Sequence, residues 1–322
     1  MAIYTKLEKE DIDNFFSKYN LGKILNYQGI KQGIENTNYL IESEKGKFIL
    51  TIYEKRVNVE DLPFFMELMT NLSNSKFQCP RPIINNNGNY ISEIKNKKAS
   101  VSSFLEGSAK KKLTPKNCYD VGTETAKMHR ITEKIKGRRT NSLSLDSWSN
   151  IYSKVEKECS SIDVNLSNTI KRSLEEIQNN WPKSLPSGII HADLFPDNIF
   201  FKNEKFSGFI DFYFSCNDFF GFDIAVCINA LCFDGQKKEL SFNVTKAKKF
   251  IDGYESVRKL EESEKINLKV LSQGAAMRFL LTRVFDYLNL EKGAIVTIKD
   301  PIEYLKRLEF HNKVKNYSDY YI

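Results

Sequence analysis

The spacing of hydrophobic residues changes near Thr114, and this change is the strongest constraint on how the chain can fold. Before Thr114, short segments rich in β-branched and aromatic residues lie between turn residues, as in antiparallel strands. After it, apolar residues recur at three- and four-residue intervals, as on one face of a helix. We therefore predict an α+β fold, in which an antiparallel sheet precedes a larger and mainly helical part.

The sheet-forming part is predicted to contain about five strands and one inserted helix. The strands are predicted over residues 24–29, 38–42, 47–53, 90–94 and 99–104, with turn signals at 44–46 and 85–88. A helix is predicted over residues 59–72, because four apolar side chains share one helical face: Val59, Leu62, Met66 and Met69. Pro63 lies early enough in this helix to be tolerated.

The helical part begins with a clear start signal. Thr114 is a typical N-cap, and Pro115 occupies the first helical position. A further helix is predicted over residues 166–181, and long helical patterns return after Asp218, through residues 275–290, and again near 301–311. The stretch 105–108 looks like a connection between the two parts. We therefore predict a bilobal chain, with residues 1–105 as an N-lobe and 106–322 as a C-lobe.

Composition excludes several classes of protein. Apolar residues make up 41% and charged residues 28% of the 322 residues, which is typical of a globular chain. No apolar run approaches the ~20 residues of a membrane helix, and the N-terminus has no secretory pattern. The six cysteines form no Cys-x-x-Cys pair, so reduced cytoplasmic thiols are expected. The net charge of +7 comes from dispersed lysines, which disfavours nucleic-acid binding.

The residues that indicate chemistry lie in one loop and at the end of a later strand. The loop 191–198 reads His-Ala-Asp-Leu-Phe-Pro-Asp-Asn and is flanked by apolar strand-like segments. Asp193 and Asn198 have the spacing of the protein-kinase catalytic loop, and Asp211 follows thirteen residues after Asn198. This pattern predicts phosphoryl transfer, with Asp193 as the base and Asn198 and Asp211 as ligands of magnesium. The alternative is a surface turn that is rich in Asp and Asn.

Three neighbouring residues are interpreted as structural support. His191 is expected to hold the backbone of the loop, not to carry a proton. Asp223 is predicted to begin a helix, from which it could bond the backbone of the catalytic loop. His129, at the end of an amphipathic helix, is interpreted as a packed or capping histidine.

Five stretches together resemble the homoserine kinases of the aminoglycoside-phosphotransferase superfamily, which also includes choline kinases. The similarity covers nearly the whole chain, and the stretches that carry it are residues 33–40, 48–56, 191–198, 208–218 and 276–283. The resemblance implies a bilobal protein-kinase-like fold and ATP-dependent phosphorylation of L-homoserine on the threonine pathway. It also implies ATP and Mg²⁺ as the cofactors, with a small amino acid as the substrate.

The nucleotide site is predicted on the first lobe. Because side chains alternate along a strand, one face carries Ile49, Thr51 and Tyr53. Thr51 then takes the place of the lysine that is usual in kinases. This leaves the phosphate-binding cation unassigned, with Lys55 and Arg56 as candidates. Five further residues complete the predicted nucleotide-binding set. Asn36, Thr37 and Asn38 belong to the turn before the second strand, and Phe104 and Leu105 lie at the end of the fifth.

Two arginines are candidates for binding the carboxylate of the substrate. Arg278 and Arg283 lie five residues apart on a predicted helix, about 140° apart around its axis. One guanidinium could bind the carboxylate through two hydrogen bonds. Alternatively, both form ordinary surface ion pairs, for example Arg283 with Asp286.

Two other functions remain as alternatives. One is a different small-molecule phosphotransferase of the same fold, acting on choline, an aminoglycoside or methylthioribose. The other is a nucleotide-binding pseudokinase, which the threonine at position 51 would allow. The presence of all three residues of the predicted magnesium and base site favours an enzyme. A cytoplasmic protein without a membrane or nucleic-acid partner is expected, and the sequence leaves its oligomeric state open.

Overall fold

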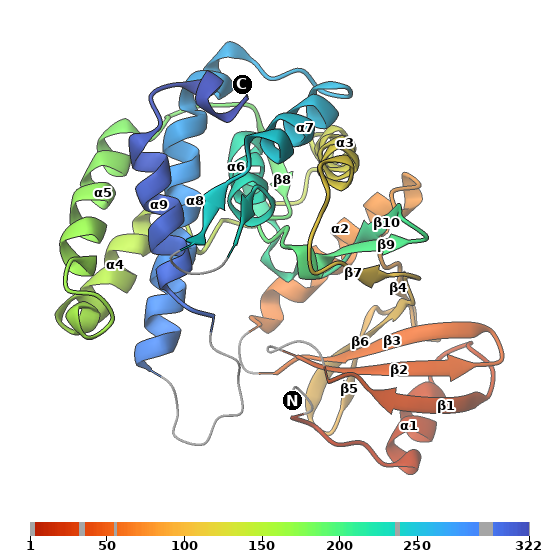
Figure 1. Cartoon of the computed structure of the whole chain (residues 1–322). Coiled ribbons are helices and arrows are strands. Elements are labelled where there is room, and N and C mark those ends of the chain that lie inside the picture. Colours follow the sequence, from red (N-terminus) through yellow and green to blue (C-terminus); the bar gives the residue numbers. More distant parts are fainter. Residues whose placement is uncertain (1–3, 32–35, 55–56, 236–238, 290–298, 322) are drawn as a thin grey trace. The chain divides into compact units, whose positions relative to one another are not determined.

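The computed structural model describes residues 4–31, 36–54, 57–235, 239–289 and 299–321. It divides into two compact units, which are coloured along the sequence in Figure 1. The first unit is Met1–Ser108 with Phe200–Tyr213, and the second is Ala109–Ile199 with Phe214–Ile322. The boundary expected from sequence placed residues 200–213 with the second part. They pack with the first unit because they bond to it, for example from Phe209 N–H to Gln78 O at 3.1 Å.

A six-stranded sheet forms the first unit. Its strand order is β1-β2-β3-β6-β4, and β5 also pairs with β6. All pairs in this sheet are antiparallel, as the turn signals predicted. The two-residue strand β4 was too short to predict. The strands are β1 (Ile24–Gly29), β2 (Thr37–Ser43), β3 (Gly46–Ile52), β4 (Pro82–Ile83), β5 (Ile91–Ile94) and β6 (Lys97–Ser103).

One face of this sheet is covered by a short helix that the sequence analysis missed. In α1 (Lys9–Phe16), Ile12 and Phe15 are buried in one cluster with Leu50 and Ile52 of β3. The predicted inserted helix is present as α2 (Leu62–Asn74), and its first three residues form a 3₁₀ turn instead. A smaller sheet has the order β10-β9-β7, from β7 (Ser108–Ala109), β9 (Ile199–Lys202) and β10 (Lys205–Phe209).

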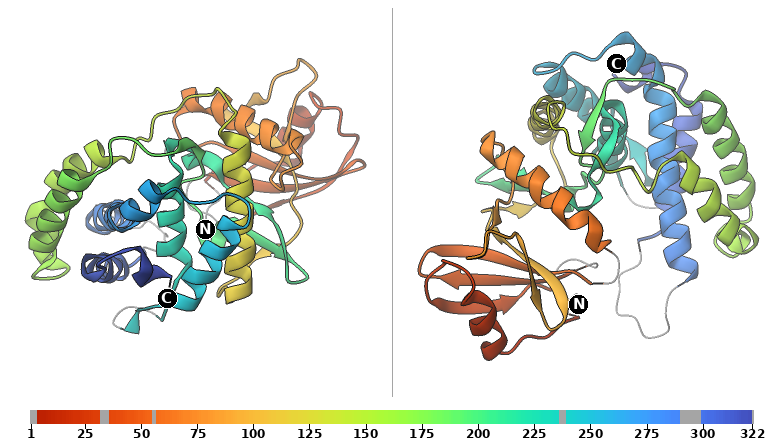
Figure 2. Two further views of the ribbon diagram at one scale, coloured as in Figure 1. Left: turned by 90° about the horizontal axis from the view of Figure 1, so that it is seen from above. Right: turned by 180° about the vertical axis from the view of Figure 1, so that it is seen from behind.

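Helices dominate the second unit, in agreement with the prediction. Figures 1 and 2 show α9 alongside the long helix α8, with α4 and α5 nearby. Helix α8 begins at a capping box in which Glu261 and Glu264 bond each other's backbone N–H groups. The helices are α3 (Pro115–Thr132), α4 (Leu145–Val155), α5 (Leu166–Asn180), α6 (Phe220–Leu231), α7 (Val244–Glu255), α8 (Glu262–Leu288) and α9 (Ile302–Lys313).

Two glycines allow α3 and α7 to approach closely. A Cβ atom on Gly122 would lie 2.0 Å from the carbonyl oxygen of Phe250. A Cβ atom on Gly253 would lie 2.1 Å from the carbonyl oxygen of Tyr119. Since neither contact involves a movable side chain, any larger residue would force the helices apart.

The start of α3 is as predicted, with the Thr114 hydroxyl accepting from Asn117 N–H at 3.2 Å.

A short antiparallel pair positions the catalytic loop. Strand β8 (Ser187–Ile190) pairs with β11 (Cys216–Phe219), and Ile190 lies opposite Cys216. The loop 191–198 leaves the end of β8, while α6 follows β11 directly. This pairing therefore brings the first turn of α6 next to the loop.

A second pair joins β12 (Phe233–Asp234) and β13 (Ser241–Phe242). None of the helices described is both long and apolar enough to span a bilayer.

Candidate active site

Asp193 and Asn198 lie together in the loop that follows β8. The Asn198 side-chain amide donates to the Asp193 carbonyl oxygen at 2.8 Å and to its carboxylate at 3.0 Å. These bonds hold the carboxylate in one orientation and leave Oδ1 of Asn198 as an acceptor. His191 is fully buried, and its Nδ1 accepts from Asp193 N–H at 3.3 Å. The loop itself thus orients the two side chains expected to carry chemistry.

The residue before Asp193 has a strained backbone that is held from two sides. Ala192 has φ +65°, a left-handed conformation that is uncommon for residues other than glycine. Its N–H donates to the Asp223 carboxylate at 2.8 Å, and its carbonyl accepts from Arg278 Nη1 at 2.5 Å. Such conformations persist only where the surroundings impose them. Asp223 and Arg278 therefore determine how Asp193 is presented.

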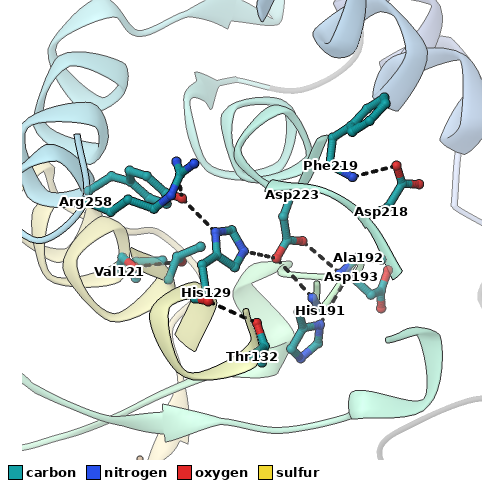
Figure 3. A network of polar contacts seen from close by, with 12 residues as sticks. Val121, His129, Thr132, His191, Ala192, Asp193, Asp218, Phe219, Asp223 and Arg258 are labelled. Carbon is teal, nitrogen blue, oxygen red and sulfur yellow. Dashed lines mark hydrogen bonds and ion pairs between the residues drawn. The ribbon is translucent and has the colours of Figure 1, made fainter. Parts of the chain in front are cut away.

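The Asp223 carboxylate also joins the loop to the histidine of α3. It accepts from His191 N–H at 3.0 Å, and its contact with His129 Nε2 is 3.1 Å (Figure 3). Burial raises the pKa of Asp223, but the bonds from His129 and the backbone outweigh it and leave the pKa below its ordinary value. Asp223 is therefore ionised and serves as a buried acceptor for three donors.

His129 is part of a chain of hydrogen bonds that begins at Arg258. Burial lowers the pKa of His129 and keeps the ring neutral, although Asp223 opposes this shift. The Arg258 guanidinium donates to the Tyr254 hydroxyl at 3.2 Å, and that hydroxyl lies 2.8 Å from His129 Nδ1. The tautomer that satisfies this network has Nδ1 as an acceptor and Nε2–H donating to Asp223. A rigid set of buried contacts thus supports the loop.

The two candidate arginines have different surroundings. Arg278 is buried, and within the described part of the chain its Nε has no hydrogen-bond partner and its guanidinium forms no ion pair. Its guanidinium packs over Phe279 and Phe214, at 4.6 and 5.6 Å from the ring centroids. Arg283 instead donates to the Glu303 carboxylate and to the Asp300 carbonyl, both at 3.0 Å. Only the charge of Arg283 is already balanced by a carboxylate.

In the first unit, one face of the sheet presents the expected nucleotide-binding side chains. Asn38 lies opposite Thr51 in the β2–β3 ladder, and the Thr51 hydroxyl donates to Asn38 Oδ1 at 2.8 Å. Ile49 precedes Thr51 on the same face and is half-buried. The Thr37 side chain is on the opposite face, fully buried, and donates to Glu54 at 2.8 Å. Its hydroxyl is therefore engaged within the protein.

The remaining residues of that set lie at the edges of the same sheet. Asn36 is buried, and its Oδ1 accepts from Glu54 N–H at 3.3 Å. Phe104 and Leu105 directly follow β6 and are half-buried. The candidate phosphate-binding cations, Lys55 and Arg56, lie outside the described residues.

Asp211 follows β10 in the first unit and also has a left-handed backbone, with φ +64°. Two residues later, the Tyr213 hydroxyl accepts from the Tyr53 hydroxyl at 3.1 Å. Tyr53 is itself 2.7 Å from the Ser100 hydroxyl on β6. A buried set of hydroxyl groups thus anchors the segment that carries Asp211, on the same sheet face as Thr51.

Comparison with known proteins identifies the family. Residues 26–260 match the phosphotransferase enzyme family. Homoserine kinase from Agrobacterium fabrum is 42% identical over 99% of this chain and 98% of its own length. Homoserine kinase from Xanthobacter autotrophicus is 43% identical over 99% of both chains. The chain belongs to the homoserine kinase family.

Two solved structures with low sequence identity to this chain have the same fold. Amicoumacin kinase, solved with AMP-PNP, Ca²⁺ and amicoumacin, aligns with a TM-score of 0.71 at 15% identity, covering 97% of both chains. Choline kinase from Cryptosporidium parvum aligns with a TM-score of 0.64 at 17% identity, covering 95% of both chains. The prediction of an α+β, kinase-like fold is therefore confirmed.

The two predicted magnesium ligands have the donor type that this ion needs. Among the described residues, no group of three or more His, Cys, Asp or Glu side chains could hold a metal ion alone. Kinases need no such cluster, because nucleotide phosphates and water supply the other ligands. The two expected ligands are the Oδ1 of Asn198 and the carboxylate of Asp211. Both offer hard oxygen atoms, which Mg²⁺ prefers.

The structure also reveals support residues that the sequence could not indicate. Tyr254 and Arg258 were not predicted, because each is separated from His129 by more than 120 residues and belongs to no motif. The one available signal was the four-residue spacing of Tyr254, in the last turn of α7, and Arg258, just beyond its end.

Replacing Asp223 by Asn is expected to lower the free energy of unfolding by about 3–5 kcal/mol. The side-chain NH₂ group of the asparagine would face a buried N–H donor where a carboxylate oxygen now accepts a hydrogen bond. Urea unfolding followed by circular dichroism measures this loss. The control is Asp120→Asn, which removes an exposed ion pair with Lys116 on α3 and should cost less than about 1 kcal/mol. Equal losses in the two variants would contradict the role given to Asp223.

Proposed function

We propose that this protein uses ATP to phosphorylate the side-chain hydroxyl of L-homoserine, giving O-phospho-L-homoserine for threonine biosynthesis. The observation that carries the proposal is 42–43% identity with homoserine kinases over 99% of the chain. The chemistry of the catalytic loop supports it, because Asp193 and Asn198 have the residue types and spacing of a phosphotransferase. A pseudokinase would need no carboxylate held in this way.

In the proposed mechanism, Asp193 accepts or orients the proton of the homoserine hydroxyl. The Asn198 amide holds the Asp193 carboxylate, and Asp223 and Arg278 hold the backbone on its N-terminal side. Each of these contacts exists before the substrate binds, which reduces the reorganisation needed during the reaction. Asn198 and Asp211 would bind the Mg²⁺ that accompanies ATP and neutralises the phosphate charge.

The first lobe, residues 1–105, would bind the nucleotide, and the second, 106–322, would bind homoserine. Ile49, Phe104 and Leu105 would contact the base, while Asn36, Thr37 and Asn38 would bond the phosphates through backbone or side-chain groups. Thr51 would occupy the place of the usual lysine. The six buried, unpaired cysteines fit a reducing cytoplasm, and we expect no nucleic-acid or membrane partner.

Arg278 would bind the substrate carboxylate. A buried guanidinium without a carboxylate partner is costly unless an anion binds it. Its Nε has no partner among the described residues, while its Nη1 bonds the residue next to Asp193. The carboxylate and hydroxyl of homoserine are only a few bonds apart, so one molecule could contact both residues. Arg283 is less suitable because Glu303 already neutralises it.

The function is tested by measuring ADP release with a panel of alcohols. The panel contains homoserine, choline, ethanolamine, methylthioribose and kanamycin. We expect kcat/KM for homoserine to exceed that for every other alcohol. If another alcohol is consumed and homoserine is not, the protein is a phosphotransferase of different specificity. If no alcohol is consumed while ATP binds, the pseudokinase alternative is favoured.

Replacing Arg278 by Ala is expected to raise KM for homoserine by an amount equivalent to ~2–5 kcal/mol, since a buried charge pair would be lost. KM for ATP should remain nearly unchanged, and kcat should fall because the Ala192 carbonyl loses its donor. Steady-state kinetics with each substrate varied in turn separate these effects.

Arg283→Ala is the matched control, because it removes the other guanidinium of the same helix. Its KM for homoserine should stay close to that of the wild type. Arg278→Lys, which keeps the charge but loses the Nε–H donor, covers the case in which the alanine variant does not fold. Wild-type KM for homoserine in both Arg278 variants would place the carboxylate site elsewhere.

A further inference from the structure

Tyr304 of α9 has a buried hydroxyl that forms no hydrogen bond within the described part of the chain. Its side chain is fully buried, and its oxygen has no hydrogen-bond partner among the described residues. Buried hydroxyl groups are nearly always bonded, because an unsatisfied one loses its contacts with water. Such a group in a native protein therefore calls for an explanation, and a bound ligand is one that can be tested.

The surroundings of Tyr304 connect it to the catalytic loop. Its ring lies 5.2 Å from that of Phe279 and 6.4 Å from that of Phe195, which is a residue of the loop. Phe279 in turn packs against Arg278, whose guanidinium is 4.6 Å from its ring centroid. Phe279 thus contacts two side chains, Tyr304 and Arg278. Each of them carries a polar group without a hydrogen-bond partner among the described residues.

The surroundings of the Tyr304 hydroxyl make it a hydrogen-bond donor. Arg283 and Arg307 lie over its ring, at 4.4 and 4.7 Å from the centroid. Burial raises the pKa of the Tyr304 hydroxyl, and nearby Asp193 raises it further, against the opposing effect of the arginines. The hydroxyl therefore remains protonated at neutral pH and can donate a hydrogen bond. Arg278 Nε–H is also a donor, so both vacant groups require an acceptor.

We propose that the Tyr304 hydroxyl is a specificity-determining group that donates a hydrogen bond to the carboxylate of the amino-acid substrate, beside Arg278. This inference rests on the proposed function, since it names a further contact for the same substrate. A carboxylate can accept several hydrogen bonds, so it satisfies both vacant donors at once. An alcohol without a carboxylate leaves them unpaired, and sites built in this way strongly reject such analogues.

The test combines one variant with two substrates. Tyr304→Phe removes only the hydroxyl and keeps the ring that supports Arg283, Arg307 and Phe279. The second substrate is 3-aminopropan-1-ol, which has the amine, chain and hydroxyl of homoserine but lacks the carboxylate. In Tyr304→Phe, kcat/KM for homoserine should fall about 10- to 100-fold, as expected for the loss of a hydrogen bond to a charged group. The value for 3-aminopropan-1-ol should not change.

Tyr317→Phe is the matched control. The Tyr317 hydroxyl is also buried without a partner among the described residues, but its ring lies near Lys265 at the start of α8. Thirteen residues separate Lys265 from Arg278, which is about 20 Å along the helix. This variant should keep wild-type kinetics with both substrates. The Tm of Tyr304→Phe without substrate should equal or exceed that of the wild type, because no protein hydrogen bond is lost.

Each outcome separates this inference from the proposed function. Unchanged kcat/KM for homoserine in Tyr304→Phe, or an equal fall with both substrates, would overturn the role of Tyr304 while homoserine kinase activity stands. A lowered Tm with equal kinetic losses would show that the hydroxyl supports the fold, and would also overturn it. If the wild-type protein does not phosphorylate homoserine, the proposed function fails first.

Discussion

Replacing Asp193 by Asn is expected to lower kcat by about 10²- to 10⁴-fold, because an amide cannot accept the proton of the substrate hydroxyl. The fold should persist, since Asn is close in size to Asp and the carbonyl of residue 193 still accepts from Asn198. ATP affinity should change little, because the base acts on the other substrate. Turnover is measured by ADP release, and ATP binding by calorimetry.

Asp197 provides the control for this experiment, since it lies in the same loop but is exposed. Asp197→Asn removes a charge of the same sign from the loop and leaves the side chains of Asn198 and Arg278 in place. It should retain turnover close to the wild type. Near-normal turnover in Asp193→Asn would remove Asp193 from the mechanism, whereas equal losses in both variants would indicate a general effect of loop charge.

Replacing Asp211 by Asn is expected to raise the Mg²⁺ concentration needed for activity, or to abolish activity at every concentration tested. Loss of a charged oxygen ligand weakens binding of a divalent ion and displaces it. The left-handed backbone at this position should remain, because Asn tolerates φ near +64° better than most residues. The effect is therefore assigned to the missing charge, and rates measured over a range of Mg²⁺ concentrations quantify it.

Glu67→Gln is a suitable control, because Glu67 is an exposed acid on α2 in the same unit. Its Mg²⁺ dependence should match that of the wild type. If Asp211→Asn also retains the wild-type Mg²⁺ dependence, Asp211 only ends a strand and the metal site must be sought elsewhere.

The sequence alone determined the order of elements and the candidate chemistry, because both depend on local patterns. Hydrophobic period distinguishes strands from helices within a few residues, and Thr114 with Pro115 marks a helix start directly. The spacing of Asp193 and Asn198 is likewise local, since one loop carries both. Helix α1 was missed because eight residues hold little periodic signal.

Only the tertiary structure decided which distant residues support these side chains. His129 and Asp223 are 94 positions apart, and Arg278 is 86 positions from the Ala192 carbonyl that it bonds. Nor could the sequence distinguish Arg278 from Arg283, since identical side chains on one helix differ only in burial and partners. The same is true of Tyr304, whose vacant hydroxyl is visible only when every neighbouring group has been placed. Hydrogen bonds and desolvation act through space between packed elements, and sequence separation carries no record of them.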